Sequence, residues 1–161
     1  MSHCHITVDI SAQSLTLYKN NKTIKSYLIS SSFNGVGEEK DSFKTPRGKH
    51  IIRAKIGQGS AINTVFDSRR PTGEVYSSEF RKKHPNRDWI LTRILWLSGI
   101  EVGKNRLGNQ DTMQRYVYIH GSPDTATMGK PGSRGCIRMH NKDLIELFDL
   151  IPVYTPIEII E

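Results

Sequence analysis

Cys136 and His120 are the two residues whose types and spacing could support nucleophilic catalysis. A cysteine thiol with an ordinary pKa of about 8.5 is only slightly ionised at neutral pH, so a nucleophilic cysteine needs a base or a cation nearby. His120 ends a predicted strand, and the chain between it and Cys136 is long enough to form a loop that returns beside it. The pair therefore predicts a cysteine nucleophile served by a histidine general base.

The residues around Cys136 favour a reactive thiol. Cys136 follows Gly135 and precedes a helix predicted to begin at residue 141, so we expect an exposed turn near the positive end of a helix dipole and a lowered pKa. Arg134 and Arg138 add positive charge, and a glycine lets backbone N–H groups approach an oxyanion closely. The alternative is a buried structural cysteine and an unrelated surface histidine, which is the commoner meaning of an arbitrary Cys and His pair.

The elements that must position these residues are mostly strands. Alternating apolar and polar residues predict strands over 6–10, 15–17, 23–30, 49–55, 116–120 and 154–160. One helix is predicted after Cys136, with Asn141 as its N-cap and Pro152 as its end. The expected fold is mainly β with one principal helix, in a single domain over 1–161.

The segment 67–110 has no clear periodicity. It combines glycines and prolines with a basic run at 81–83 and an apolar patch over 89–97. A long irregular insertion of this kind is more often functional than idle. We expect Trp96 and the Arg69-Arg70 pair to wall a substrate cleft.

Several motifs along the chain resemble one family. IHG at 119–121 followed by SRGCIRM at 133–139 is similar to the signature of the L,D-transpeptidase (YkuD-like) family. LTLY at 15–18, TPRG at 45–48, TRILWL at 92–97 and HNKD at 140–143 match in family order, so the resemblance covers nearly the whole chain. It implies the β-sandwich or barrel-like domain of that family.

The resemblance implies a role for each residue of the signature. Cys136 attacks a peptide carbonyl, His120 accepts the thiol proton, and the Gly121 carbonyl orients the imidazole. The backbone N–H groups of Gly135 and Cys136 form the oxyanion hole, and Ser133 shapes the turn or binds substrate.

Three further side chains are assigned to substrate. Arg138 binds a carboxylate of the substrate or locks the active-site turn. Arg134 takes a position where some members carry histidine, so we assign it to substrate binding and not to catalysis. Trp96 completes the set.

The implied substrate is a peptidoglycan stem tetrapeptide, cut between the L-centre of its third residue, diaminopimelate, and the terminal D-alanine. Transfer of the acyl group to water is L,D-carboxypeptidase action, which we favour, in muropeptide recycling. Transfer to an amine, giving 3-3 cross-links or exchanged D-amino acids, is the alternative. A peptidoglycan-binding module without catalysis is the rival from another class, although binding alone requires neither Cys136 nor His120.

The charge and composition of the chain indicate which ligands and partners to expect. The net charge of +7 suits carboxylate-bearing substrates, and the scattered basic residues carry no nucleic-acid-binding motif. His3, Cys4 and His5 lack the paired spacing of a zinc site, so no metal or cofactor is expected. There is no membrane-spanning run and no signal peptide, so we expect a cytoplasmic monomer. A leader removed before Met1 would instead indicate the periplasm or cell envelope.

Overall fold

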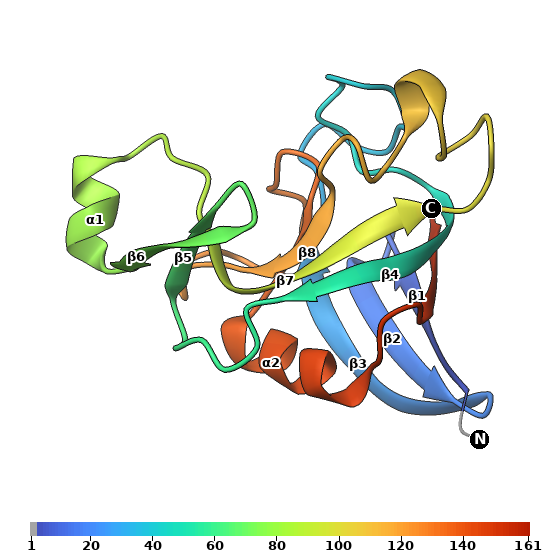
Figure 1. Cartoon of the computed structure of the whole chain (residues 1–161), viewed down its shortest axis with the longest axis horizontal. Coiled ribbons are helices and arrows are strands. Elements are labelled where there is room, and N and C mark those ends of the chain that lie inside the picture. The colour runs from blue at the N-terminus through green and yellow to red at the C-terminus, as the bar shows by residue number, and fades with distance from the viewer. Residues whose placement is uncertain (1–2) are drawn as a thin grey trace.

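A closed β-barrel carries the site, and a hairpin extension projects from one side of it (Figure 1). The computed structural model describes residues 3–161. The elements in chain order are β1 (Cys4–Asp9), β2 (Ser14–Lys19), β3 (Lys22–Ser30), β4 (Gly48–Ile56), β5 (Thr64–Asp67), β6 (Arg70–Val75), α1 (Ser78–Lys83), β7 (Ile90–Gly99), a 3-10 turn (Gly108–Gln110), β8 (Tyr118–Gly121), β9 (Ile137–Met139), α2 (Asn141–Leu150) and β10 (Pro156–Ile160).

Eight strands form the barrel, in the order β4-β10-β1-β2-β3-β9-β8-β7, and pairing of β4 with β7 closes it. The pairs β1–β10 and β8–β9 are parallel and the other pairs are antiparallel. The hairpin of β5 and β6 extends the sheet beyond β7. The prediction of a mainly β, barrel-like fold with one principal helix is confirmed, and the short helix α1 is an addition.

Alternation along the strands places one face of each in the barrel core. Ile6, Val8, Leu15 and Leu17 are buried in this core, as their spacing predicts. The turn that joins β2 to β3 has positive φ at Asn20 and Asn21, the conformation that a two-residue hairpin loop requires and that asparagine tolerates.

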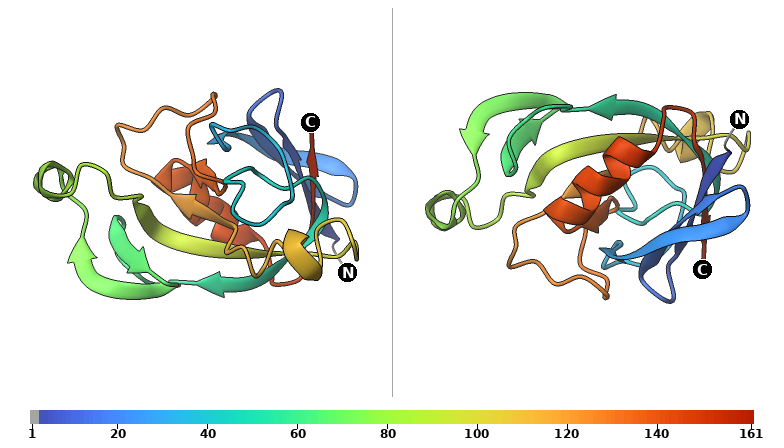
Figure 2. Two further views of the ribbon diagram at one scale, coloured as in Figure 1. Left: turned by 90° about the horizontal axis from the view of Figure 1, so that it is seen from above. Right: turned by 90° about the horizontal axis from the view of Figure 1, so that it is seen from below.

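Helix α2 crosses one open end of the barrel (Figure 2). It buries Leu144, Leu147 and Phe148 in the barrel core, and burial of a large apolar side chain contributes about 1.5–3 kcal/mol. Its N-cap is His140, without a side-chain capping bond, so the prediction of Asn141 as N-cap is wrong. The Asn141 side chain accepts a hydrogen bond from Thr92 instead, which ties the start of the helix to β7.

The segment 67–110 is more ordered than its sequence suggests. It contains β6, α1 and the whole of β7, which is the strand that closes the barrel. The apolar patch over 89–97 fails to alternate because β7 is covered on both faces. Leu95 and Leu97 point into the barrel core, whereas Ile94 lies in a second apolar cluster with Phe66 and Tyr118.

Candidate active site

His120 lies on β8 and Cys136 directly precedes the neighbouring strand β9, and their side chains are on the same face of the sheet. In the parallel pair β8–β9, Ile119 is opposite Ile137 and His120 is opposite Arg138. Ile119 and Ile137 point into the barrel core, so the alternate residues face outwards, where Cys136 packs with the cluster of Tyr118. The loop 122–132 thus returns the chain beside His120, as its length predicts.

His120 is fully buried and its two ring nitrogens differ in their surroundings. Nδ1 is 2.7 Å from the Gly121 carbonyl oxygen, which is the contact expected from the resemblance. Nε2 is buried and has no hydrogen-bond partner among the described residues. Burial lowers the pKa of His120, opposed by the nearby Asp88 carboxylate, so the ring is neutral at pH 7. A neutral ring with Nδ1–H donated to Gly121 leaves Nε2 as a free acceptor.

The Cys136 sulfur is held by backbone groups. It accepts a hydrogen bond from the Tyr118 N–H at 3.3 Å and donates towards the Tyr116 carbonyl oxygen at 3.5 Å. No hydrogen bond joins it to His120 in the described structure, consistent with the free Nε2. Catalytic hydrogen bonds are often long before substrate binds.

The thiol is less acidic than the sequence predicts. Burial raises the pKa of Cys136 to about 12, and Asp88 acts in the same direction against Arg138 and Arg115. The prediction of a pKa lowered by the helix dipole is wrong because β9 separates the sulfur from α2, and the dipole acts only within the first turn. Cys136 and His120 are therefore both neutral at rest.

The turn before Cys136 is held by Ser133. The Ser133 hydroxyl donates to the Cys136 carbonyl oxygen and accepts from the Gly135 N–H at 3.2 Å. Gly135 has a φ of +127°, a conformation that favours glycine. The Gly135 N–H is already bound to Ser133, so of the two N–H groups expected to form the oxyanion hole only that of Cys136 remains. The Gly135 carbonyl accepts from the buried Thr45 hydroxyl at 3.0 Å, which connects the TPRG turn to the site.

The two arginines that flank Cys136 are used differently. Arg138 donates to the Gly132 carbonyl and to Asp88, both at 3.0 Å, so its fork fixes the active-site turn against the extension. Of its two expected roles, these contacts favour the structural one. Arg134 is exposed, donates to the Asn86 carbonyl and lines the cavity described next.

A cavity of about 580 Å³ leads to the sulfur. Its walls come from the loop before β4, from the tip of the β5–β6 hairpin and from the segment before β8, and they include Lys40, Phe43, Arg69, Arg115, Tyr116, Tyr118 and Arg134. Arg69 therefore lines the cleft as expected. Arg70 and Trp96 do not, and Trp96 lies behind Arg69, whose guanidinium is 5.0 Å from the indole ring.

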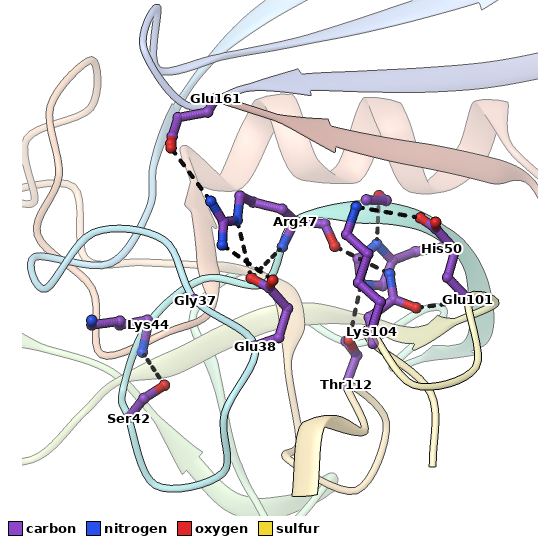
Figure 3. A network of polar contacts seen from close by, with 12 residues as sticks. Gly37, Glu38, Ser42, Lys44, Arg47, His50, Glu101, Lys104, Thr112 and Glu161 are labelled. Carbon is purple, nitrogen blue, oxygen red and sulfur yellow. Dashed lines mark hydrogen bonds and ion pairs between the residues drawn. The ribbon is translucent and has the colours of Figure 1, made fainter. Parts of the chain in front are cut away.

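The loop 33–47 forms one wall, and Arg47 at its end holds it through polar contacts (Figure 3). Arg47 donates three hydrogen bonds to Glu38, two from its guanidinium and one from its backbone N–H, and lies 3.6 Å from Glu161. Nearby, the buried His50 bridges the Gly48 carbonyl and the Thr112 hydroxyl, both at 2.9 Å, and burial lowers its pKa to about 4.

Arg115 holds the middle of this loop. Its guanidinium donates to the carbonyls of Gly37 and Lys44 and to the Ser42 hydroxyl. Arg115, Asp88 and Thr45 are site residues that the sequence reasoning missed. Only Thr45 carried a signal, since it belongs to the TPRG motif.

The histidines and cysteine at the N-terminus are remote from this site. Cys4 packs against the barrel core, and the His5 ring stacks on Tyr18 at 4.7 Å. Within residues 3–161, no group of three or more His, Cys, Asp or Glu side chains is arranged to hold a metal ion. In the same part of the chain, neither helix has the length and apolar character needed to cross a membrane.

Comparison with known proteins points to one family. The family model for YkuD, described as the L,D-transpeptidase catalytic domain, matches residues 4–159. The YkuD protein of Bacillus subtilis (strain 168) is 31% identical over 155 residues, which cover 96% of this chain and 65% of that protein. The YkuD protein of Bacillus licheniformis is 29% identical over 154 residues, covering 96% and 64%. The chain thus spans just under two thirds of the length of these relatives.

Solved structures share the fold. An L,D-transpeptidase from Mycobacterium smegmatis has a TM-score of 0.60 at 19% identity, covering 99% of this chain and 59% of that one. L,D-transpeptidase 3 from Mycobacterium tuberculosis has a TM-score of 0.61 at 14% identity, covering 99% and 62%.

Proposed function

The chain belongs to the L,D-transpeptidase catalytic domain family, and from this premise we propose that it forms an acyl-enzyme at Cys136 from peptidoglycan stem tetrapeptides. The observation that carries the proposal is the placement of Cys136 at the end of a cavity and on the same face as a buried histidine with a free Nε2. A binding module would need neither group.

The first half-reaction follows from this arrangement. A substrate carbonyl placed in the cavity leads the thiol to turn from the Tyr116 carbonyl towards His120, which takes the proton at Nε2 while sulfur attacks the carbonyl carbon. The Cys136 N–H donates to the resulting oxyanion. His120 then returns the proton to the leaving amine, the C–N bond breaks, D-alanine leaves, and a thioester remains on Cys136.

The acceptor decides the finer activity, and we propose water, which gives L,D-carboxypeptidase action on muropeptides. A second cavity of about 280 Å³, bordered by Arg81, Trp89 and Arg138, does not reach the sulfur, because the Arg138–Asp88 ion pair stands between the two. Water needs no second binding site, whereas the amine of an acceptor peptide does. Transpeptidation to such an amine is the alternative, favoured by the family match.

Mass spectrometry of the protein incubated with a disaccharide tetrapeptide tests the proposal. Loss of alanine alone is the expected result, and exchange with an added D-amino acid would show transpeptidation instead. Cys136→Ala should abolish both products while the protein remains folded, and His120→Gln should reduce turnover by about 10²–10⁴-fold. Turnover that survives Cys136→Ala would refute the nucleophile assignment.

A further inference from the structure

Arg69 stands at the tip of the β5–β6 hairpin, where the backbone is strained. Asp67 pairs with Arg70, so Ser68 and Arg69 form a two-residue loop. Their φ angles are +48° and +67°, in the region that glycine and asparagine favour for such loops. Strain of this kind persists where the surrounding structure holds it, and it clusters at sites that bind ligands. Here it directs one long cationic side chain into the cavity of Cys136.

The Arg69 guanidinium is fixed by aromatic residues and not by an acid. It lies 4.4 Å from the Tyr116 ring centroid and 5.0 Å from that of Trp96, both in the range of a cation–π contact. One of its N–H groups donates to the Tyr118 hydroxyl at 2.9 Å. No Asp or Glu within residues 3–161 forms an ion pair with it. A guanidinium has five N–H donors, so most of its fork remains available.

Arg69 is one of four cations in the cavity wall, with Lys40, Arg115 and Arg134, against two acids. Of the two acids in the wall, Asp88 is already paired with Arg138, and Asp41 lies with Lys40 on the opposite loop. The Arg115 guanidinium is occupied by the loop 33–47. The Arg134 guanidinium donates to the Asn86 carbonyl. The cavity therefore has an excess of positive charge, and Arg69 enters it from the tip of the hairpin.

We propose that Arg69 binds the terminal carboxylate of the stem peptide, on the D-alanine that leaves, and so selects donors with a free C-terminus. This inference rests on the proposed function. Tyr118 spans the site, since its N–H contacts the Cys136 sulfur and its hydroxyl contacts Arg69. A tyrosine side chain is roughly as long as two residues of extended chain. The carboxylate of the substrate lies one residue beyond the attacked carbonyl, so it reaches the space between the Cys136 sulfur and the Arg69 guanidinium. There it accepts two parallel hydrogen bonds from the guanidinium.

Equilibrium binding to the catalytically inert Cys136→Ala protein tests this inference without turnover. Two ligands are titrated by calorimetry, a disaccharide tetrapeptide with a free C-terminus and the same compound with a C-terminal amide. With Arg69 present, the acid should bind about 10- to 100-fold more tightly than the amide. Arg69→Gln should remove this preference by weakening the acid alone, and Arg69→Lys should restore only part of it because lysine has no planar fork.

Arg70→Gln is the matched control. It removes the same charge at the neighbouring position, where the side chain is exposed and lies outside the cavity, so the preference for the acid should persist. Thermal melting checks that each variant is folded.

The outcomes separate this inference from the function on which it rests. Equal binding of acid and amide, or a preference that survives Arg69→Gln, refutes the role of Arg69 and leaves the proposed function intact. A protein that binds neither ligand refutes both.

Discussion

Alkylation of Cys136 by iodoacetamide should be slow in the folded protein and should continue to accelerate at high pH. Only the thiolate reacts, and burial raises the pKa of this thiol from an ordinary value of about 8.5–9 to about 12. Three pKa units lower the thiolate fraction about 1,000-fold at neutral pH. A more basic thiolate is a better nucleophile, with a Brønsted slope of about 0.4–0.5. The higher nucleophilicity offsets about 15- to 30-fold of the rate lost through the smaller thiolate fraction. The net effect at neutral pH is a reaction on the order of 10- to 100-fold slower than that of the unfolded chain.

The assay follows the carbamidomethylated peptide of Cys136 by mass spectrometry between pH 6 and 10. The urea-unfolded protein supplies the reference rate, and the peptide of Cys4 in the same digest reports on reagent activity. We expect the native rate to rise roughly tenfold per pH unit up to pH 10, because the thiolate fraction grows by that factor below the pKa.

A rate that levels off between pH 6 and 8 would refute this reasoning. Such a plateau is the signature of a preformed thiolate–imidazolium pair, in which His120 already holds the proton. The structure has instead a neutral thiol bonded to a backbone carbonyl and a neutral ring.

Three further predictions concern the framework. Gly121→Ala should destabilise the protein by about 2 kcal/mol or more in urea denaturation, because the added Cβ would lie 2.6 Å from the Leu91 carbonyl oxygen. The pKa of His50 is about 4 in the folded protein and 6.5 in the unfolded chain, so its contribution to the free energy of unfolding is complete above pH 6.5. About 3 kcal/mol of that free energy is lost as the pH falls to 4. Urea denaturation of His50→Gln across this pH range should lack that loss, and an unchanged pH dependence would contradict the reasoning. Asp88→Asn removes a carboxylate that raises the pKa of His120, so the acid limb of kcat/KM against pH should move to lower pH; a shift upwards would be inconsistent with the geometry.

The sequence predicts the barrel strands where one face is buried and the other is not. Ile6, Val8 and Leu15 alternate cleanly, and their strands form as expected. The prediction fails at β7 because a strand covered on both faces has no period of two to detect. The strand that closes the barrel was therefore interpreted as part of an irregular insertion.

The sequence indicates which motif residues folding brings together, but not the environment of their side chains. The motif residues Cys136, His120 and Gly121 come together because β9 pairs with β8, with Ile137 opposite Ile119. The alternation of the sequence predicts no strand over 137–139, so only the family motif grouped these residues. The thiol pKa could not be predicted, since it depends on how completely the extension and neighbouring loops desolvate the sulfur. Asp88 was missed for a similar reason. It is an isolated acid in a basic stretch, and its role depends on its contact with Arg138, which only the fold creates.

A neutral pair at rest has a consequence for selectivity. Charge separation between Cys136 and His120 is costly in a desolvated site, so the transfer must be coupled to a ligand that stabilises the resulting charges. An attacked carbonyl moves the negative charge from sulfur to an oxygen that the Cys136 N–H stabilises, and an imidazolium is favoured by the nearby Asp88. A small electrophile without a carbonyl in the oxyanion position gains none of this. Slow alkylation and the proposed acyl transfer are therefore compatible in one site, since burial opposes only the ionisation of the thiol without a bound substrate.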